Sequence, residues 1–423
     1  MAILLGVDTG GTYTDAVLLR DEAEVIASAK ALTTRQDLAI GVAGAVRRVL
    51  EQSGIGPEEI ALASLSTTLA TNALVEGQGG RVALVYIGFR EGDLDRHGLA
   101  EVLKGDPALV LTGGHDHGGT EAAPLDTEAL ETFLTSDAAQ VTGFAVAAQF
   151  ATRNPAHELA AARIIAERTG RPVTCSHQLS ARLNGPRRAV TAVLNARLVG
   201  MIDRLIGRAQ DVLTEMGITA PLMVVRGDGA LMSAEQARIR PIETILSGPA
   251  ASIVGARWLT GIDEGLVSDI GGTTTDVAML KGGRPAIDPE GAEVGGHRTM
   301  VEAVAMRTTG LGGDSQVHVV TEGLDGGVSL GPRRVLPVLP PRLPRWCTAH
   351  LTSSCARRRW ENTTDGFYAR CPVWRRRGFR RESPTCWRGW AVTSTRWAMF
   401  CARGWSRVPW AGWSTAGWYK SPG

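Results

Sequence analysis

Two short segments of the chain share one pattern of acidic, glycine and threonine residues. The first phosphate turn reads Asp8-Thr9-Gly10-Gly11-Thr12-Tyr13-Thr14-Asp15, and the second reads Asp269-Ile270-Gly271-Gly272-Thr273-Thr274-Thr275-Asp276. Glycines let backbone N–H groups approach an anion closely, and threonine hydroxyls add further donors. An aspartate beside such a turn can hold a hydrated Mg²⁺ or orient a water molecule. The pattern therefore predicts two sites that bind phosphate.

Each turn follows one apolar run and leads into another, which is typical of a strand, a tight turn and a second strand. The runs are residues 3–7 and 16–19 for the first turn, and 266–268 and 277–280 for the second. Two such hairpins, about 260 residues apart, predict two lobes that hold one nucleotide phosphate chain from opposite sides. An ordinary structural hairpin is the alternative for each turn.

The paired turns resemble those of the sugar kinase, Hsp70 and actin superfamily, which binds ATP between two related lobes. A narrower resemblance, to the hydantoinase A and 5-oxoprolinase family, covers residues 1 to about 335. It is carried by the two turns and by the segments Gly6-Val7-Asp8, Ser66-Thr67-Thr68-Leu69-Ala70-Thr71-Asn72-Ala73-Leu74, Arg240-Pro241-Ile242-Glu243-Thr244-Ile245-Leu246-Ser247-Gly248-Pro249-Ala250-Ala251 and Thr308-Thr309-Gly310-Leu311-Gly312-Gly313-Asp314-Ser315. The resemblance implies an α/β, two-lobed actin/Hsp70-like (ribonuclease H-like) ATPase fold with an incomplete second lobe.

The resemblance also implies roles for individual residues. Asp8 and Asp269 are expected to be catalytic and to hold Mg²⁺ through water. ATP is expected to contact the glycines and threonines of both turns and a glycine-rich loop on its adenosine side: Gly10, Gly11, Thr12, Gly271, Gly272, Thr273, Thr274, Gly310, Gly312, Gly313 and Ser315. A plain turn is the alternative for that loop. Asp15 and Asp276 occupy matching positions after each turn, where capping a turn and contacting magnesium are both open.

A polar cluster of Thr67, Thr68 and Asn72 precedes or opens a predicted helix. Because a helix N-terminus presents backbone N–H groups, these residues are expected to bind an anionic substrate or phosphate. Simple N-capping is the alternative. Residues 247–250 could likewise open a helix toward the nucleotide or merely turn the chain. The His115-Asp116-His117 segment is expected to be a flexible polar loop rather than a metal site.

By resemblance, the expected function is that of an ATP-dependent hydrolase subunit. ATP would phosphorylate the carbonyl oxygen of a cyclic amide of the hydantoin or 5-oxoproline type, or of a related carbonyl substrate, so that water can open the ring. A B-type hydantoinase subunit is the expected partner. The alternatives are a sugar-type kinase of the same superfamily and an inactive, truncated nucleotide-binding fragment.

The composition changes abruptly near residue 335. Residues 1–334 contain one Trp and one Cys, whereas residues 335–423 contain ten Trp and five Cys. Lys and Arg number 29 against 40 Asp and Glu in the first segment, and 16 against 3 in the second. The net charge of +2 is therefore an average over an acidic body and a basic tail. Nucleic acid is not an expected partner of the body.

The tail, residues 335–423, is expected to be a disordered product of a frameshift. It shows no sustained helical or alternating apolar period. In a GC-rich gene, a CTG leucine codon followed by G or C reads one base later as TGG, for Trp, or TGC, for Cys. A nucleic-acid-binding tail and a cysteine module are the alternatives. Reading the DNA in the other two frames tests this hypothesis, which fails if neither frame continues the body.

Alternating strand and helix patterns predict α/β lobes over residues 1–185 and 186–334. Strands are expected at residues 3–7, 16–19, 24–28, 82–87, 141–149, 172–175, 222–226, 266–270 and 277–280, and helices at 37–53, 127–136, 155–169 and 187–216. The single Cys of the body favours a reducing compartment, so the cytoplasm is the expected location. No signal peptide is visible, and no apolar run approaches the roughly 20 residues that a membrane span requires.

Overall fold

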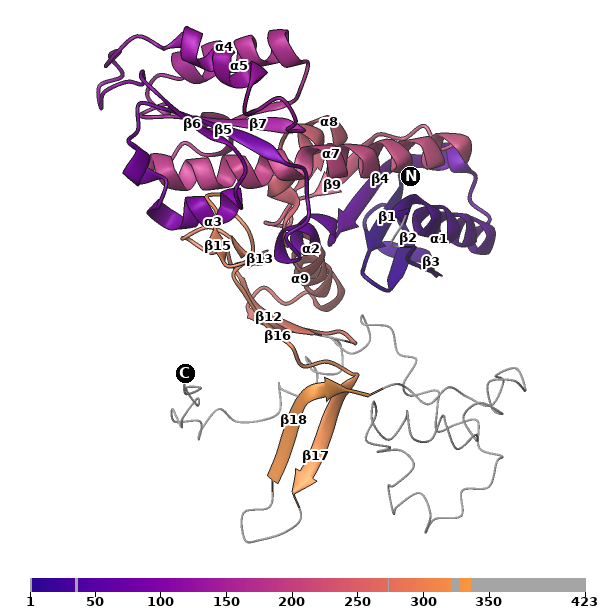
Figure 1. Ribbon diagram of the computed structural model, residues 1–423. Helices are drawn as coiled ribbons and strands as arrows, with labels where there is room; N and C mark the ends of the chain where they lie inside the picture. Colours follow the sequence, from indigo (N-terminus) through magenta and orange to yellow (C-terminus); the bar gives the residue numbers. More distant parts are fainter. Residues whose placement is uncertain (1, 35–36, 273, 321–326, 336–423) are drawn as a thin grey trace, which may run out of the picture. The chain divides into compact units, whose positions relative to one another are not determined.

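The computed structural model describes residues 2–34, 37–272, 274–320 and 327–335 (Figure 1). The described residues form two compact units: unit 1 lies within Met1–Gly255 and Leu280–Ala305, and unit 2 lies within Ala256–Met279 and from Met306 to residue 335. Thr273 and the tail from residue 336 lie outside the described residues. The frameshift hypothesis and the predicted domain boundaries at residues 185 and 334 therefore stay predictions.

Unit 1 contains a six-stranded sheet with the order β10-β9-β4-β1-β2-β3. Three strands form an antiparallel meander, and β4 and then β9 continue the sheet parallel to β1. The bounds are β1 (Ile3–Thr9), β2 (Tyr13–Arg20), β3 (Glu24–Leu32), β4 (Ile60–Thr67), β9 (Leu222–Val225) and β10 (Leu231–Ser233). This order is the one expected of a ribonuclease H-like lobe.

Alternating side chains of this sheet are buried beneath helix α1 (Leu38–Ser53). Ile3, Leu5 and Val7 of β1 point to one face, as the period of two in a strand requires. The helix begins where Asp37 accepts a hydrogen bond from the Ala39 N–H over 3.0 Å, and it ends at Gly54, whose φ is 69°.

A second sheet of unit 1 has the order β6-β5-β7-β8, with every pair parallel. Its bounds are β5 (Val82–Ile87), β6 (Ala108–Leu111), β7 (Gly143–Ala148) and β8 (Val173–Cys175). All residues of β5 and β7 are buried because helices cover both faces. Val85 packs with α4 (Thr127–Thr135) and α5 (Ala156–Thr169) on one face, and Tyr86 packs with the other core.

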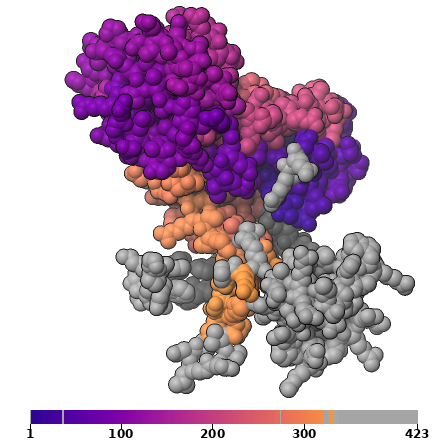
Figure 2. Space-filling view, viewed as in Figure 1, coloured from indigo at the N-terminus to yellow at the C-terminus, as the bar shows by residue number. Residues whose placement is uncertain are grey.

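The 31-residue helix α7 (Gly185–Glu215) joins the two sheets of unit 1. It packs against β5 and β7 of the second sheet and against α1 on the first. Figure 2 shows the two parts as separate masses, indigo for the N-terminal sheet and purple for the second sheet, with the rose-coloured helix between them. The shorter helices of unit 1 are α2 (Leu69–Val75), α3 (Leu99–Leu103), α6 (Ser176–Leu179) and α8 (Ala234–Ile239).

Two elements cross the division between the units, namely α9 (Ser247–Thr260) and β12 (Thr275–Lys281). In unit 2, β12 pairs with β11 (Gly265–Ile270) and with β16 (Met306–Thr309). A separate antiparallel hairpin consists of β17 (Ser315–Val320) and β18 (Gly327–Arg334). The last short strands of unit 1 are β13 (Arg284–Pro285), β14 (Glu293–Val294) and β15 (His297–Arg298).

Candidate active site

The first phosphate turn connects β1 with β2 in unit 1. The Gly10 N–H donates to the Tyr13 carbonyl oxygen over 3.0 Å and closes the turn. Thr33, directly after β3, braces it from the side: its Oγ1 donates to Gly10 O over 2.9 Å and its N–H donates to Thr12 O over 3.0 Å. Gly11 and Thr12 are exposed. The predicted turn is therefore formed, with its tip at the surface of unit 1.

The second phosphate turn connects β11 with β12 in unit 2 and has the same closing bond. The Gly271 N–H donates to Thr274 O over 2.9 Å, as Gly10 does to Tyr13. The middle position, Thr273, lies outside the described residues. The two turns thus share a closing hydrogen bond from the N–H of the first glycine to the carbonyl oxygen three residues later.

The predicted adenosine-side loop lies against the second turn, within unit 2. The Gly313 N–H donates to Gly271 O and the Asp314 N–H donates to Gly272 O, each over 2.9 Å. Ser315 is buried, and its Oγ accepts from the Gly312 N–H over 2.9 Å. Gly310 and Gly313 are exposed. The structure therefore places this loop against the second turn, and its contact with adenosine stays a prediction.

The carboxylates of the two turns have different surroundings. Asp15 forms an ion pair with Lys30 over 2.8 Å. Asp276 accepts a hydrogen bond from Thr308 Oγ1 over 2.6 Å. Burial raises the pKa of Asp276, the hydroxyl bond opposes this shift, and the charge of Asp269 raises the pKa further. Asp269 and Asp276 are therefore close enough to interact.

Asp8 belongs to unit 1 and Asp269 to unit 2. Their convergence on one magnesium ion stays a prediction. Within unit 2, the charge of Asp269 acts on Asp276, and a role for these carboxylates in magnesium binding stays a prediction.

The three predicted substrate residues lie beside the first turn. Thr67 is buried, and its Oγ1 accepts from the Leu69 N–H over 3.1 Å. The N-cap residue of α2 is Thr68, whose side chain makes no capping hydrogen bond. Thr68 Oγ1 donates to Thr9 O over 3.5 Å, and Asn72 Nδ2 donates to Thr68 Oγ1 over 3.3 Å. A substrate role for the cluster stays a prediction.

Residues 247–250 open the helix α9 at the end of β4. The Ser247 hydroxyl donates to Thr67 O over 2.9 Å, and the Leu246 N–H donates to Thr71 Oγ1 over 2.9 Å. Leu246 has a left-handed φ of 60°, which is strained for a residue with a β-carbon. These bonds fix where the first turn of α9 begins, next to α2 in Figure 1.

Ser66 is a candidate that sequence reasoning missed. It is 3% exposed, and its Oγ has no hydrogen-bond partner among the described residues. It is the register partner of Asp8 in the parallel pair of β4 and β1. Ser66 belongs to a segment that carries the family resemblance, but the strand that contains it was not predicted, so no local signal set it apart from Thr67 and Thr68.

Another cluster, of Glu158, Cys175 and His177, has ligand atoms within 4.8 Å of one another. The buried Glu158 carboxylate already accepts four hydrogen bonds from nearby donors: Ala148 N–H, Ser176 Oγ, His177 N–H and His177 Nδ1. Burial and the charge of Glu158 raise the pKa of Cys175 to about 12. The thiol is protonated, and both oxygens of the Glu158 carboxylate already accept hydrogen bonds, so this cluster is a structural hydrogen-bond network rather than a metal site.

The His115–His117 segment is a polar loop with hydrogen bonds of its own, and its flexibility stays a prediction. Asp116 Oδ1 accepts from the Gly118 N–H over 2.8 Å and from the Thr120 N–H over 2.9 Å. His115 is buried whereas His117 is exposed. The two imidazoles therefore face different surroundings, and the structure does not bring them together as ligands.

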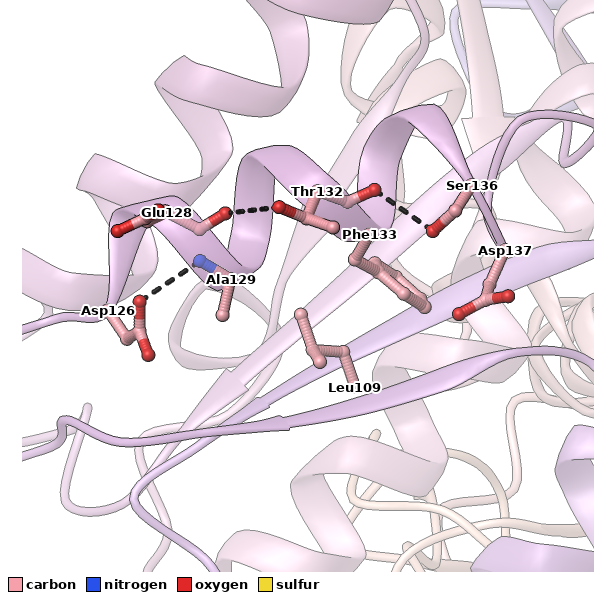
Figure 3. A pocket seen from close by; sticks show the side chains of 8 residues that line it. All are labelled: Leu109, Asp126, Glu128, Ala129, Thr132, Phe133, Ser136 and Asp137. Carbon is pink, nitrogen blue, oxygen red and sulfur yellow. Dashed lines mark hydrogen bonds between the residues drawn. The ribbon is translucent and has the colours of Figure 1, made fainter.

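A cavity of about 400 Å³ opens beside α4 (Figure 3). Its polar groups already serve the helix: Asp126 accepts from the Ala129 N–H, and the Thr132 and Ser136 hydroxyls donate to carbonyls one turn earlier. Its lining contains none of the predicted site residues and consists of Leu109, Asp126, Glu128, Ala129, Thr132, Phe133, Ser136 and Asp137. The cavity gives no support to a catalytic role.

Comparison with known protein families shows the family to which the chain belongs. The hydantoinase/oxoprolinase N-terminal region matches residues 4–169, and hydantoinase/oxoprolinase matches residues 188–341. The chain belongs to the hydantoinase/oxoprolinase family. The family resemblance seen in the motifs is therefore confirmed, and both phosphate turns fall inside the matched ranges.

Two relatives in this family are subunits of larger enzymes. Caprolactamase subunit alpha of Pseudomonas jessenii is 28% identical over 353 residues, which is 78% of this chain and 50% of that protein. The acetophenone carboxylase gamma subunit of Aromatoleum aromaticum is 29% identical over 375 residues, covering 78% and 49%. The chain thus spans about half the length of these hydantoinase/oxoprolinase relatives.

Solved structures show the same fold. The nucleotide-free structure of acetone carboxylase aligns with a TM-score of 0.64 and 22% identity, over 79% of this chain and 51% of that one. The ATP-dependent caprolactamase from Pseudomonas jessenii aligns with a TM-score of 0.63 and 27% identity, over 78% and 51%. The predicted α/β fold of the actin and Hsp70 type is confirmed.

Among the described residues, no helix has the length and apolar character needed to cross a bilayer.

Proposed function

We propose that this chain is the ATP-binding part of an enzyme that activates a small amide by phosphorylating its carbonyl oxygen. The observation that carries the proposal is the shared closing bond of two phosphate turns, from Gly10 to Tyr13 and from Gly271 to Thr274, in a hydantoinase/oxoprolinase chain. ATP dependence appears in the descriptions of the caprolactamase and acetone carboxylase structures, which supports the same cofactor here.

In the proposed reaction, backbone amides of both turns hold the phosphates of ATP, and the loop from Gly310 to Ser315 lies on the adenosine side. Asp8 and Asp269 hold water around Mg²⁺, which neutralises charge on the phosphates when it is bound. The amide oxygen attacks the γ-phosphorus, and ADP leaves with the electron pair. Water then adds to the activated carbon, and the adduct expels the ring nitrogen as an amine, which leaves an acyl phosphate. A second water adds to the acyl carbon, and phosphate leaves with the former carbonyl oxygen, so that a carboxylate remains.

The proposed substrate is a cyclic amide of the hydantoin or 5-oxoproline type, with a related ketone or other carbonyl compound as the wider class. Thr67, Thr68 and Asn72 lie beside the first phosphate turn and are proposed to line the substrate side. A B-type hydantoinase subunit is the proposed partner, because the relatives are named as subunits. The proposed location is the cytoplasm.

The position of an oxygen label tests the chemistry. An amide substrate with ¹⁸O in its carbonyl is incubated with ATP, Mg²⁺, the full chain and its partner subunit, and the phosphate released is examined by ³¹P NMR. Transfer of ¹⁸O into phosphate is the expected result, because the carbonyl oxygen leaves with phosphorus. A stable phosphate ester as product would instead indicate a kinase, and unlabelled phosphate would indicate plain ATP hydrolysis.

A further inference from the structure

A buried hydroxyl points toward the start of α9. A β-carbon placed on Gly248, the second residue of this helix, would lie 4.0 Å from Ser66 Oγ and 3.4 Å from Thr68 Cγ2. Ser66 is 97% buried, given its exposure of 3%, and its Oγ lacks a partner among the described residues. Buried polar groups are nearly always hydrogen-bonded, so an unpaired hydroxyl beside a helix start needs an explanation.

The first turn of α9 offers the complementary donors. Backbone N–H groups at a helix start have no partner within the helix, and the helix dipole favours negative charge there. Gly248 carries no side chain, which lets an anion approach closely. The turn is held in place by the bond from Ser247 Oγ to Thr67 O and by the bond from Leu246 N–H to Thr71 Oγ1.

The neighbouring carboxylate limits which anion fits. Asp8 is the register partner of Ser66, and register partners in a parallel pair point to the same face of the sheet. Any anion beside Asp8 is repelled unless Mg²⁺ lies between the two. A phosphoryl group offers three acceptor oxygens, so it can bind Mg²⁺ and still accept hydrogen bonds from the helix start, whereas a carboxylate offers two oxygens.

We propose that Ser66 and the start of α9 bind the phosphoryl group after it has left ATP. The occupant is a tetrahedral phosphate, either the phosphate ester of the activated carbonyl or the orthophosphate released from it. Ser66 Oγ donates to one oxygen, and the N–H groups of Ser247 and Gly248 donate to others. This inference rests on the proposed function and adds a site for the transferred group to it.

Two substitutions remove the site while preserving the fold. Ser66→Ala deletes a hydroxyl that has no partner among the described residues, so unfolding free energy stays constant or rises. Gly248→Ala fills the approach to the helix start, and its new β-carbon meets Thr68 at an ordinary contact distance of 3.4 Å. Thermal unfolding of both variants is measured first, so that loss of binding can be separated from loss of folding.

Each variant has a matched control on the same element. Ser64→Ala changes a serine two residues earlier on β4, whose Oγ donates to Leu5 O over 3.5 Å. Gly255→Ala changes a glycine later on α9, where a β-carbon would meet no described atom within 4 Å. Neither control residue contacts the proposed phosphate site.

Calorimetric titration of the full chain with Mg²⁺ present uses three ligands: orthophosphate, methyl phosphate and ADP. We expect Ser66→Ala and Gly248→Ala each to weaken binding of both phosphates about tenfold or more, the effect of losing a hydrogen bond to a charged group. The controls and the affinity for ADP should stay within about twofold, inside ordinary variation for a remote site. Tighter binding of methyl phosphate identifies the ester as the occupant, and tighter binding of orthophosphate identifies the product.

The outcomes separate this inference from the proposed function. Equal weakening of ADP and phosphate by Ser66→Ala would assign the start of α9 to the nucleotide, which overturns the inference and leaves ATP use intact. Absence of phosphate binding to the unmodified chain, or unchanged binding in both variants, also overturns it. Failure of ADP to bind the unmodified chain contradicts the proposed function, while the phosphate titrations remain interpretable.

Discussion

Asp8 and Asp15 are register partners across the β1–β2 hairpin, and Asp15 forms a 2.8 Å ion pair with Lys30. Two acidic residues of one motif therefore lie opposite each other in the hairpin, and Asp15 has Lys30 as its ion-pair partner. Asp8 has Ser66 as its partner on the other side, in β4. The hairpin therefore contains its own internal control for a test of magnesium and nucleotide binding.

Asp8→Asn is expected to weaken Mg-ATP binding by about tenfold or more, because a neutral amide binds a hydrated divalent cation less well than a carboxylate. Isothermal titration of the full chain measures the affinity. Asp15→Asn should change it by less than about twofold, since an exposed ion pair contributes little. Equal losses for the two variants would contradict a distinct role for Asp8.

The raised pKa of Asp276 predicts that the stability of the folded chain depends on pH. Because its pKa is raised in the folded chain, the folded state binds more protons than the unfolded state above the ordinary pKa of about 4, and stability falls as pH rises through that window. Asp276→Asn should raise the unfolding temperature at neutral pH, and the gain should vanish at acidic pH. Asp263→Asn, at an exposed ion pair with Arg257, is the control. A neutral-pH gain that persists unchanged in acid would contradict the prediction.

The effect of Mg²⁺ on thermal stability tests whether Asp269 and Asp276 bind the ion. If Asp269 and Asp276 hold the ion together, Mg²⁺ should raise the unfolding temperature of the unmodified chain more than that of Asp276→Asn. Thermal unfolding followed by circular dichroism, with and without Mg²⁺, measures the difference. Identical shifts in the two proteins would exclude Asp276 from magnesium binding.

Glu158→Gln is expected to lower the unfolding free energy by about 1 to 3 kcal/mol, because the amide nitrogen that replaces one carboxylate oxygen cannot accept the two hydrogen bonds made to that buried oxygen. Urea denaturation measures this loss. Glu167→Gln on the same helix α5 is the matched control, since Glu167 is exposed, and its effect should stay within about 0.5 kcal/mol. A small effect at Glu158 would contradict a stabilising role for these hydrogen bonds.

Cys175 should resist alkylation in the folded chain. Burial and the charge of Glu158 raise its pKa to about 12, so almost no thiolate exists near pH 8. Iodoacetamide labelling followed by peptide mapping should find Cys175 unmodified until denaturant is added. Rapid labelling of the Cys175 peptide under native conditions would refute both the burial and the pKa.

Local signals predicted the elements that carry strong patterns. The strand at residues 82–87 was predicted with its observed bounds, and α1 starts at Leu38, one residue after the predicted start, because Asp37 is its N-cap. For α5, the helix starts at Ala156, one residue later than predicted, with Asn154 Oδ1 accepting from its N–H. Element ends of this kind vary by a residue because the last turns fray.

Nine strands of the described residues, namely β4, β6, β10 and β13 to β18, escaped prediction because tertiary pairing outweighs local preference. β4 contains Ala and Ser residues that disfavour strands, yet it pairs along its length with β1. The candidate site was likewise only partly predictable, because some of its contacts join residues that are far apart in the sequence. Ser247 reaches Thr67 across 180 residues of chain, a contact that no spacing rule reveals. Both phosphate turns, by contrast, were visible because each is encoded by a few adjacent residues.

Each phosphate turn is closed by main-chain atoms alone. An aromatic residue, Tyr13, accepts the closing bond in one turn and a hydroxyl residue, Thr274, accepts it in the other. The side chains at these two positions can consequently diverge without opening the loop. The two halves of the protein can take on unequal tasks over evolutionary time while both keep the same cradle for an anion.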